Sequence, residues 1–169
     1  TDAPTPKPGY AALSWSKALS EGGYNNHGQP LLIDGALVLA IKNKLNAYSC
    51  ETGDLIASVP MVQSTNNAYV PLSYADGTVY VPQNGNSIGA YYFDGEKFSV
   101  KWEKKFAVAE GSSEGFGVSP ILCCEGKLYL GFSSTATAND YEFICVDAEN
   151  GELLWRYAHQ GGFYWAGAV

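Results

Sequence analysis

The sequence predicts an all-β protein built from repeated four-stranded antiparallel units, and three observations lead to this prediction. Turns formed by an acidic residue and glycine recur at Gly35, Gly77 and Gly126, at intervals of about 40 to 50 residues, which is the period of a propeller blade. The segments between them are short and rich in β-branched and aromatic residues, as in strands. The composition, with Gly 19, Tyr 12 and Trp 4 and 16% charged residues, also favours a β protein with many turns. Together these features indicate β-propeller blades.

Three whole blades are expected at about residues 29–60, 68–107 and 118–158. Their predicted strands are 30–33, 36–41, 45–49 and 55–59 in the first, 69–74, 78–81, 88–93 and 98–103 in the second, and 119–123, 127–132, 141–146 and 153–157 in the third. Glycine stands in the turn after the first and the third strand of every unit. Because glycine has no Cβ, it adopts the positive φ that tight hairpin turns require.

The remaining segments flank these blades. Residues 1–10 contain three prolines and are expected to form a stiff linker. Residues 11–19, with Trp15, are expected to be the last strand of a preceding unit, and residues 163–169 the first strand of a following one. The predicted fold is therefore a partial β-propeller with three whole blades and flanking strands, in one domain at 11–169. Its open strand edges would permit self-association.

Charge and hydropathy exclude two classes of partner. The chain has 17 acidic and 10 basic residues and a net charge of −7. Nucleic-acid backbones are bound by clustered Lys and Arg, whereas the basic residues Lys101, Lys104 and Lys105 are interrupted by Glu103. No apolar stretch approaches the ~20 residues that span a bilayer. We therefore expect no nucleic-acid partner and no membrane insertion.

The cysteines and histidines do not form a recognised metal or catalytic motif. The four cysteines lack the Cys-x-x-Cys spacing of zinc sites. Cys123 and Cys124 are neighbours in a predicted strand and should point to opposite faces, which favours two free thiols over a strained vicinal disulfide. His27 and His159 belong to no metal pair or nucleophile motif. We assign no catalytic residue and no metal ligand.

The segment 145–155, Cys-Val-Asp-Ala-Glu-Asn-Gly-Glu-Leu-Leu-Trp, resembles the tryptophan-docking repeat of quinoprotein (PQQ-dependent) alcohol dehydrogenase-like β-propellers. That repeat reads Ala-x-Asp-x-x-Thr-Gly-x-x-x-Trp. The first unit keeps the glycine of the pattern but has Ala57 at the Trp position, and the second keeps the Trp. The resemblance implies that the Trp covers the gap between neighbouring blades and that the Asp fixes the turn. The expected structural docking residues are Gly53, Trp102, Asp147, Gly151 and Trp155.

The resemblance also implies what a PQQ site would need: a vicinal disulfide, a Ca²⁺ ion held by Glu and Asn, and a catalytic Asp. Cys123 and Cys124 are the candidates for the disulfide, but they lie in a predicted innermost strand rather than in a Gly-rich loop. No Glu, Asn and Asp set can be matched residue by residue. We therefore expect no cofactor in this chain, and PQQ with Ca²⁺ only in a longer parent.

The loops that link one blade to the next emerge on one side of a propeller, and here they are rich in Asn and aromatic residues. Asn side chains offer hydrogen-bond donors and acceptors, and aromatic rings offer flat faces, which suits a glycan or a peptide. The alternative is that the Asn residues form turns and the aromatic residues pack between blades. The candidate ligand-binding residues are Tyr24, Asn25, Asn26, Asn66, Asn67, Tyr69, Phe116, Phe163 and Tyr164.

The predicted function is a non-enzymatic binding or structural module, extracellular or at the cell surface, whose protein or carbohydrate ligand binds this inter-blade loop face. One alternative is a fragment of a PQQ-dependent dehydrogenase whose cofactor site lies in other blades. Another is a scaffold for assembly with a partner protein. Fold alone does not choose among them.

Overall fold

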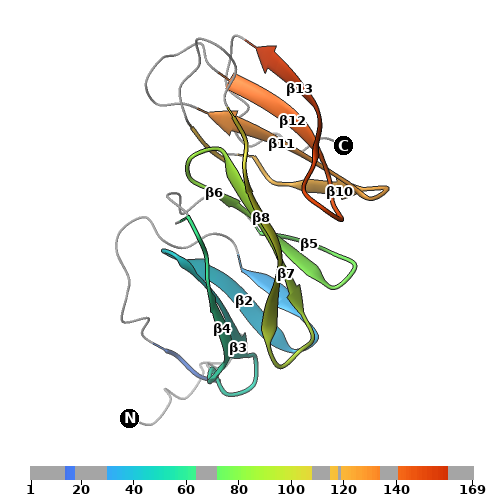
Figure 1. Ribbon diagram of the computed structural model, residues 1–169. Coiled ribbons are helices and arrows are strands. Elements are labelled where there is room, and N and C mark those ends of the chain that lie inside the picture. The colour runs from blue at the N-terminus through green and yellow to red at the C-terminus, as the bar shows by residue number, and fades with distance from the viewer. Residues whose placement is uncertain are drawn as a thin grey trace, which may run out of the picture.

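The computed structural model describes residues 14–17, 30–63, 72–107, 115–117, 119–133 and 141–159 of the chain. These residues form strands and no helix, and the strands make three antiparallel sheets that follow one another along the chain (Figure 1). Among the described residues there is therefore no helix that could cross a membrane. The predicted all-β partial propeller with four-stranded antiparallel blades is confirmed.

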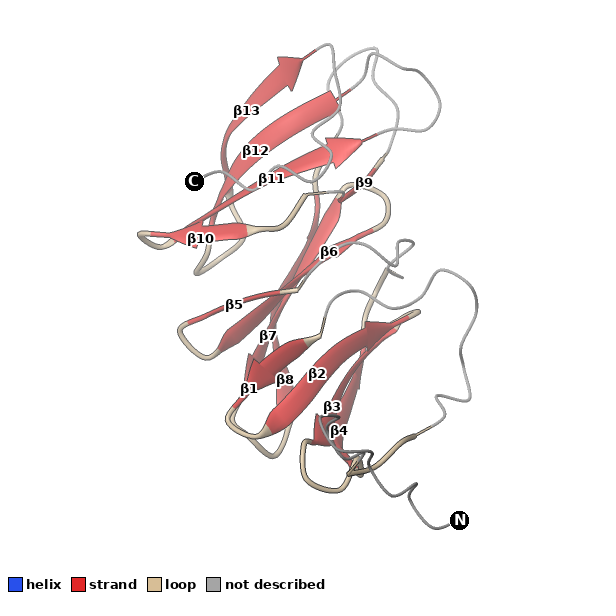
Figure 2. Cartoon of the chain, turned by 180° about the vertical axis from the view of Figure 1, so that it is seen from behind, coloured by secondary structure: helices blue, strands red, loops and turns tan. Residues whose placement is uncertain are grey.

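Each sheet is one blade, numbered here in chain order. Blade 1 contains β1 (Leu31–Ile33), β2 (Ala36–Ile41), β3 (Lys44–Ser49) and β4 (Leu55–Pro60). Blade 2 contains β5 (Ser73–Ala75), β6 (Thr78–Gln83), β7 (Ser87–Phe93) and β8 (Phe98–Lys105). Blade 3 contains β10 (Leu122–Cys124), β11 (Lys127–Ser133), β12 (Tyr141–Asp147) and β13 (Leu153–His159), and the short β9 (Phe116–Gly117) pairs with β11. The innermost strands β1, β5 and β10 follow one another along the stack of blades (Figure 2).

Two-residue turns set the register of each innermost hairpin. Both turn residues have positive φ, for example 49° at Asp76 and 75° at Gly77. Turns with two positive φ values match the right-handed twist of the strands. They also fix the register, which decides the face of the sheet on which each side chain lies. The other turns of this kind are Asp34-Gly35 and Glu125-Gly126. The recurrent acidic–Gly pairs thus mark the same hairpin in every blade.

The innermost strands of blades 2 and 3 lie closer to these turns than predicted. The sequence predicts strands at 69–74 and 119–123, whereas β5 and β10 run up to the turn residues. The reason is that a two-residue turn pairs the residues on either side of it, as it does Ala75 with Thr78 and Cys124 with Lys127.

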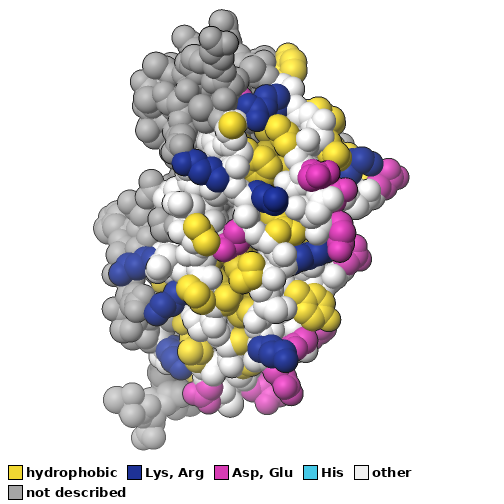
Figure 3. Space-filling model, viewed as in Figure 1, with side chains coloured by type: hydrophobic (Ala, Val, Ile, Leu, Met, Phe, Trp, Pro, Cys, Tyr) yellow, Lys and Arg dark blue, Asp and Glu magenta, His cyan; other side chains and the backbone are white. Residues whose placement is uncertain are grey.

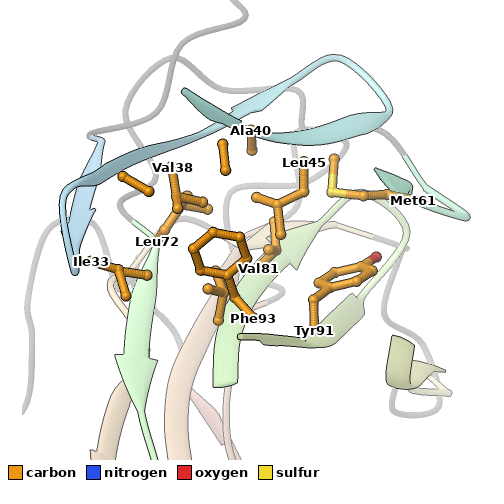
Figure 4. Close-up of a cluster of buried hydrophobic side chains, with 12 residues drawn as sticks. Ile33, Val38, Ala40, Leu45, Met61, Leu72, Val81, Tyr91 and Phe93 are labelled. Carbon is orange, nitrogen blue, oxygen red and sulfur yellow. The ribbon is translucent and has the colours of Figure 1, made fainter. Parts of the chain in front are cut away.

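Two hydrophobic clusters fill the spaces between the blades. In the first, shown in Figure 4, Val38 and Leu45 of blade 1 face Val81 and Tyr91 of blade 2. The second cluster lies between blades 2 and 3 and includes Trp102, which is 7% exposed. Blade 2 is therefore covered on both faces, and all six residues of its strand β6 are buried. Burial on both faces replaces the usual alternation of apolar and polar residues.

Candidate functional site

Blades 2 and 3 are joined by an indole that lies on a glycine turn. The Nε1 atom of Trp102 on β8 donates a hydrogen bond to the carbonyl oxygen of Ala148 at 3.1 Å. A Cβ on Gly151 would come within 2.9 Å of the indole atoms Cδ2 and Cε3. Gly151 also has a φ of 73°, which side chains disfavour. The turn of blade 3 therefore requires glycine both for its backbone conformation and for contact with the ring.

Asp147 gives this turn its shape. Its Oδ1 atom accepts hydrogen bonds from the backbone N–H of Glu149 at 2.8 Å and of Asn150 at 3.1 Å. The N–H of Gly151 donates to the carbonyl of Asp147 at 2.9 Å. With these donors bound inside the turn, the carbonyl of Ala148 is held in position for the indole.

Blade 1 holds a second indole in the same way. Trp15 Nε1 donates to the carbonyl of Cys50 at 2.7 Å. A Cβ on Gly53, whose φ is also 73°, would come within 2.7 Å of the indole atom Cε3. Lys17 Nζ donates to the carbonyl of Gly53 at 2.8 Å and lies 5.7 Å from the ring centroid of Tyr48. Trp15 thus packs on the turn of blade 1 as Trp102 of blade 2 packs on the turn of blade 3. The segment Ser14–Lys17 that carries Trp15 forms no strand.

Sequence reasoning placed Trp15 in an edge strand without assigning it a docking role. A usable signal was present, because Trp15 and Trp102 are each followed two positions later by lysine, Lys17 and Lys104. Both lysines lie at the docked turns: Lys17 binds the carbonyl of Gly53, and the Lys104 Cγ atom would be 2.8 Å from a Cβ on Gly151.

Among the described residues, the joint between blades 1 and 2 has neither an indole nor a docking glycine. Ala57 stands at the Trp position, and a Cβ on Gly95 would meet nothing within 4 Å. A polar chain holds this joint instead. The Val62 N–H donates to Glu103 Oε1 at 2.8 Å, the hydroxyl of Tyr91 donates to the same oxygen, and Gln83 Nε2 donates to that hydroxyl at 2.9 Å.

Tyr91, the middle residue of this series of hydrogen bonds, is fully buried. Its burial, together with the neighbouring Glu103 carboxylate, raises the pKa of its hydroxyl well above 10.0. The hydroxyl consequently stays neutral and acts as a donor to Glu103. Gly89 leaves room for the arrangement, because a Cβ there would come within 2.5 Å of Gln83 Nε2. Tyr91 and Glu103 thus hold this joint by hydrogen bonds, whereas a packed indole holds the joint between blades 2 and 3.

The outer face of blade 3 carries an open aromatic surface. Trp155 is 45% exposed, and its ring centroid lies 6.1 Å from that of Tyr129 and 6.2 Å from that of Phe143. A hollow of about 540 Å³ is lined by Phe143, Trp155, Arg156 and Tyr157. By contrast, the indoles of Trp15 and Trp102 lie against the glycine turns at Gly53 and Gly151.

Charged side chains concentrate elsewhere. Acidic residues lie along the edge where the hairpin turns project, at the right of the view in Figure 3. One of them, Glu149, pairs with Lys101 at 2.5 Å across the joint between blades 2 and 3. Because both partners lie at the surface, this pair contributes little compared with the indole beside it.

Most of the predicted ligand-binding residues lie outside the described part of the chain, namely Tyr24, Asn25, Asn26, Asn66, Asn67, Tyr69, Phe163 and Tyr164. Phe116 is described and pairs with Ser133 in the sheet of blade 3. The residue just before it, Gly115, is bound to Asn86: the Gly115 N–H donates to Asn86 Oδ1 at 2.7 Å, and the Asn86 N–H donates to the Gly115 carbonyl at 3.1 Å. Asn86 was not foreseen as a site residue, although it ends an Asn-Gly-Asn turn.

The residues that the structure describes do not fit a PQQ group with Ca²⁺. Cys123 and Cys124 are free thiols paired with Leu128 and Lys127 in a regular ladder, where neighbouring side chains point to opposite faces. Burial, with a smaller effect of Asp76, raises the pKa of Cys123 to about 11. Within the described ranges no three His, Cys, Asp or Glu residues lie close enough to hold a metal ion.

Comparison with solved structures identifies the fold. The chain is similar to BamB from Moraxella catarrhalis, with a TM-score of 0.55 and 16% identity over 78% of this chain and 36% of that one. It is similar to the quinohemoprotein alcohol dehydrogenase ADHIIG from Pseudomonas putida HK5, with a TM-score of 0.66 and 17% identity over 82% of this chain and 21% of that one. A europium-containing methanol dehydrogenase gives a TM-score of 0.65 and 18% identity over 86% and 27% of the two chains.

These neighbours are β-propeller proteins, so the chain has the fold of the quinoprotein alcohol dehydrogenase-like propellers that its repeat resembles. At such identities the likeness shows the fold alone. The chain spans between 21% and 36% of the length of these three structures. No protein-family model matches the sequence, and no curated protein matches it significantly.

Proposed function

We propose that this chain is a non-enzymatic binding and structural module, extracellular or at the cell surface, which takes a protein or a carbohydrate on its inter-blade loop face. The observation that carries the proposal is the pair of hydrogen bonds between Asn86 and Gly115, at 2.7 and 3.1 Å. They fix the loop backbone directly before Phe116 to the turn of blade 2. A residue whose backbone is held before binding loses less conformational entropy when a ligand arrives.

The packing of the blades supports a role as a rigid frame. The residues that carry the sequence resemblance are used in contacts between blades, as Trp102 and Gly151 show. A frame held in this way would present the loops between blades on one side, where the sequence predicts the ligand-binding residues Asn66, Asn67 and Tyr69. Asn amides and aromatic rings are the groups that bind glycans and exposed peptides.

Arrays of defined oligosaccharides and peptides would test this proposal. For any compound bound, we expect an Asn66→Ala/Asn67→Ala variant and a Phe116→Ala variant to weaken binding about tenfold or more, since each loses about 1.4 kcal/mol or more of contact. Glu96→Ala, an exposed change in a hairpin turn, serves as the control and should bind as the wild type does. Binding that is equal in all four proteins would place the ligand elsewhere and contradict the proposal.

A second function, a segment of a quinone-dependent dehydrogenase, is favoured by one finding, the likeness to dehydrogenase structures in three comparisons. This alternative places the cofactor site in other blades, so PQQ with Ca²⁺ present would be titrated into a longer parent protein that contains them. Saturable binding by that protein would favour the dehydrogenase. No binding would leave the loop-face proposal as the better account.

A further inference from the structure

Asn150 and Gly151 form a chemically reactive pair in the turn on which the indole of Trp102 lies. The backbone nitrogen of a residue can attack Cγ, the side-chain carbonyl carbon, of an Asn directly before it. Glycine favours this attack, because it has no side chain to hinder its nitrogen and its backbone is the most flexible. Asn150 is exposed, so water and base reach its amide. By its sequence, this turn is therefore a site of deamidation.

Hydrogen bonds of the turn restrain both reacting groups. The N–H of Gly151 must lose its proton before the attack, and it donates to the carbonyl of Asp147 at 2.9 Å. The Oδ1 atom of Asn150 accepts from the N–H of Glu152 at 2.8 Å, which fixes the amide side chain. The N–H of Asn150 donates to Asp147 Oδ1 at 3.1 Å. Formation of a ring between the two residues requires rotation of this backbone, and therefore requires the turn to open.

Blade 2 holds the turn in its closed form. Gly151 is buried, and a Cβ on it would come within 2.9 Å of two ring atoms of Trp102. The same indole donates to the carbonyl of Ala148 at 3.1 Å, and Lys101 pairs with Glu149 at 2.5 Å. The residues on both sides of Asn150 are thus in contact with strand β8. Opening of the turn is coupled to separation of blades 2 and 3.

We propose that Asn150 is a deamidation site controlled by the joint between blades 2 and 3, unreactive while Trp102 is docked and reactive when the joint opens. In the reaction the nitrogen of Gly151 bonds to Cγ of Asn150, and the side-chain nitrogen leaves as ammonia. Water then opens the cyclic imide at either carbonyl and gives aspartate or isoaspartate. No electrons are transferred, and water is the only other reactant. The proposal does not depend on the ligand of the loop face.

The two products should have different effects on the joint. Aspartate keeps the main chain of the turn and a side-chain oxygen that accepts from the Glu152 N–H, as Asn150 does. Isoaspartate adds a methylene group to the main chain directly before Gly151, and this displaces the glycine from the indole of Trp102. A joint that has opened and reacted in this way cannot close again as before. The modification thus converts a transient opening into a permanent one.

Peptide mass spectrometry of protein kept at pH 8, with separation of aspartyl from isoaspartyl peptides, measures the rate at Asn150. We expect Trp102→Phe to raise this rate about tenfold or more, because a reaction that is slower than closing follows the population of the open form. Trp155→Phe is the matched control, since it makes the same change at the same repeat position of blade 3, and should leave the rate unchanged. Asn84, the other Asn followed by Gly, is an internal reference that neither change should affect.

Two further measurements keep the test decisive if Trp102→Phe does not fold. A peptide of residues 145–155 gives the rate without blade 2, and wild-type Asn150 should react at least about tenfold more slowly than it. The purified isoaspartyl form of the wild type should unfold at a lower urea concentration than fresh Asn150→Asp, which should unfold close to the wild type. This comparison separates the change of the main chain from the added charge.

Three results would overturn the proposal. The first is a wild-type rate at Asn150 equal to that of the peptide. The second is a folded Trp102→Phe variant that reacts as slowly as the wild type, which would show that the turn is protected by its own hydrogen bonds alone. The third is an isoaspartyl form as stable as Asn150→Asp, which would show that the joint closes over the altered main chain.

Discussion

The indole of Trp102 lies directly on Gly151, so closely that a Cβ on the glycine would come within 2.9 Å of two ring atoms. This contact joins residues of two different blades, and the hydrogen bond from the same indole to Ala148 at 3.1 Å fixes its direction. The burial of a large aromatic ring and the satisfaction of its N–H are thus achieved at one point. The stability of the stack should depend on this contact more than on the surface ion pairs around it.

Gly151→Ala should lower the free energy of unfolding by about 2 kcal/mol or more, because it adds a steric contact with the indole to the strain of a positive φ. Gly126→Ala is the matched control, since Gly126 has a φ of 71° and a Cβ there would meet nothing within 4 Å. Its cost should be about 1 kcal/mol, from backbone strain alone. Urea unfolding of both variants measures the difference, and equal losses would show that the indole moves aside freely.

Trp102→Phe should be much more costly than Trp155→Phe. The first change removes a hydrogen bond to Ala148 and part of a buried ring, and should cost about 2–3 kcal/mol. The second affects a residue that is 45% exposed, and in dilute monomeric protein should cost about 0.5 kcal/mol or less. Denaturant midpoints of the two variants at low protein concentration provide the comparison. Losses of the same size would contradict the difference in burial.

Alkaline pH should weaken the joint between blades 1 and 2 through Tyr91. Because its pKa in the folded state is raised above 10.0 by burial and by Glu103, the unfolded chain releases the proton first. The stabilising contribution is fully present below pH 10 and is lost as pH rises above that value, by up to about 1.4 kcal/mol per pH unit.

Unfolding of wild type and Tyr91→Phe should be compared between pH 8 and pH 11. The variant should be less stable at pH 8, because Glu103 loses one of its two donors and keeps only the Val62 N–H, but its stability should fall less steeply above pH 10. Tyr80, whose pKa is also raised by burial, is present in both proteins and cancels in the difference. Parallel curves would show that the Tyr91 hydroxyl does not titrate with unfolding.

The adjacent thiols should react at very different rates. Cys124 is exposed, whereas Cys123 is partly buried and its pKa is raised from 9.0 to about 11. Since the thiolate is the reactive form, that shift alone should slow alkylation of Cys123 at pH 8 by about 100-fold. Iodoacetamide labelling followed by peptide mass spectrometry gives the rate at each site. Similar rates at the two positions would show that the blade opens readily there.

The sequence by itself determined the repeated blade and its turns. The acidic–Gly pairs and the Asn-Gly turn act through local backbone conformation, and strand alternation acts over a few residues, so both can be read without knowing the fold. For this reason the four-stranded antiparallel blades and the resemblance to quinoprotein propellers agree with the structure. The predicted loop-face residues, apart from Phe116, lie outside the residues described and remain a prediction.

Only the tertiary structure decided how the blades are joined. Trp102 and Trp155 occupy the same position in the repeat, yet one is buried and the other is open. Trp15 binds a turn 35 residues away, and Glu103 replaces the missing indole of blade 1 by accepting from Val62, 41 residues earlier. A residue's partner in such joints depends on which sheet packs against it. That choice is made by contacts between distant segments, which no local pattern encodes.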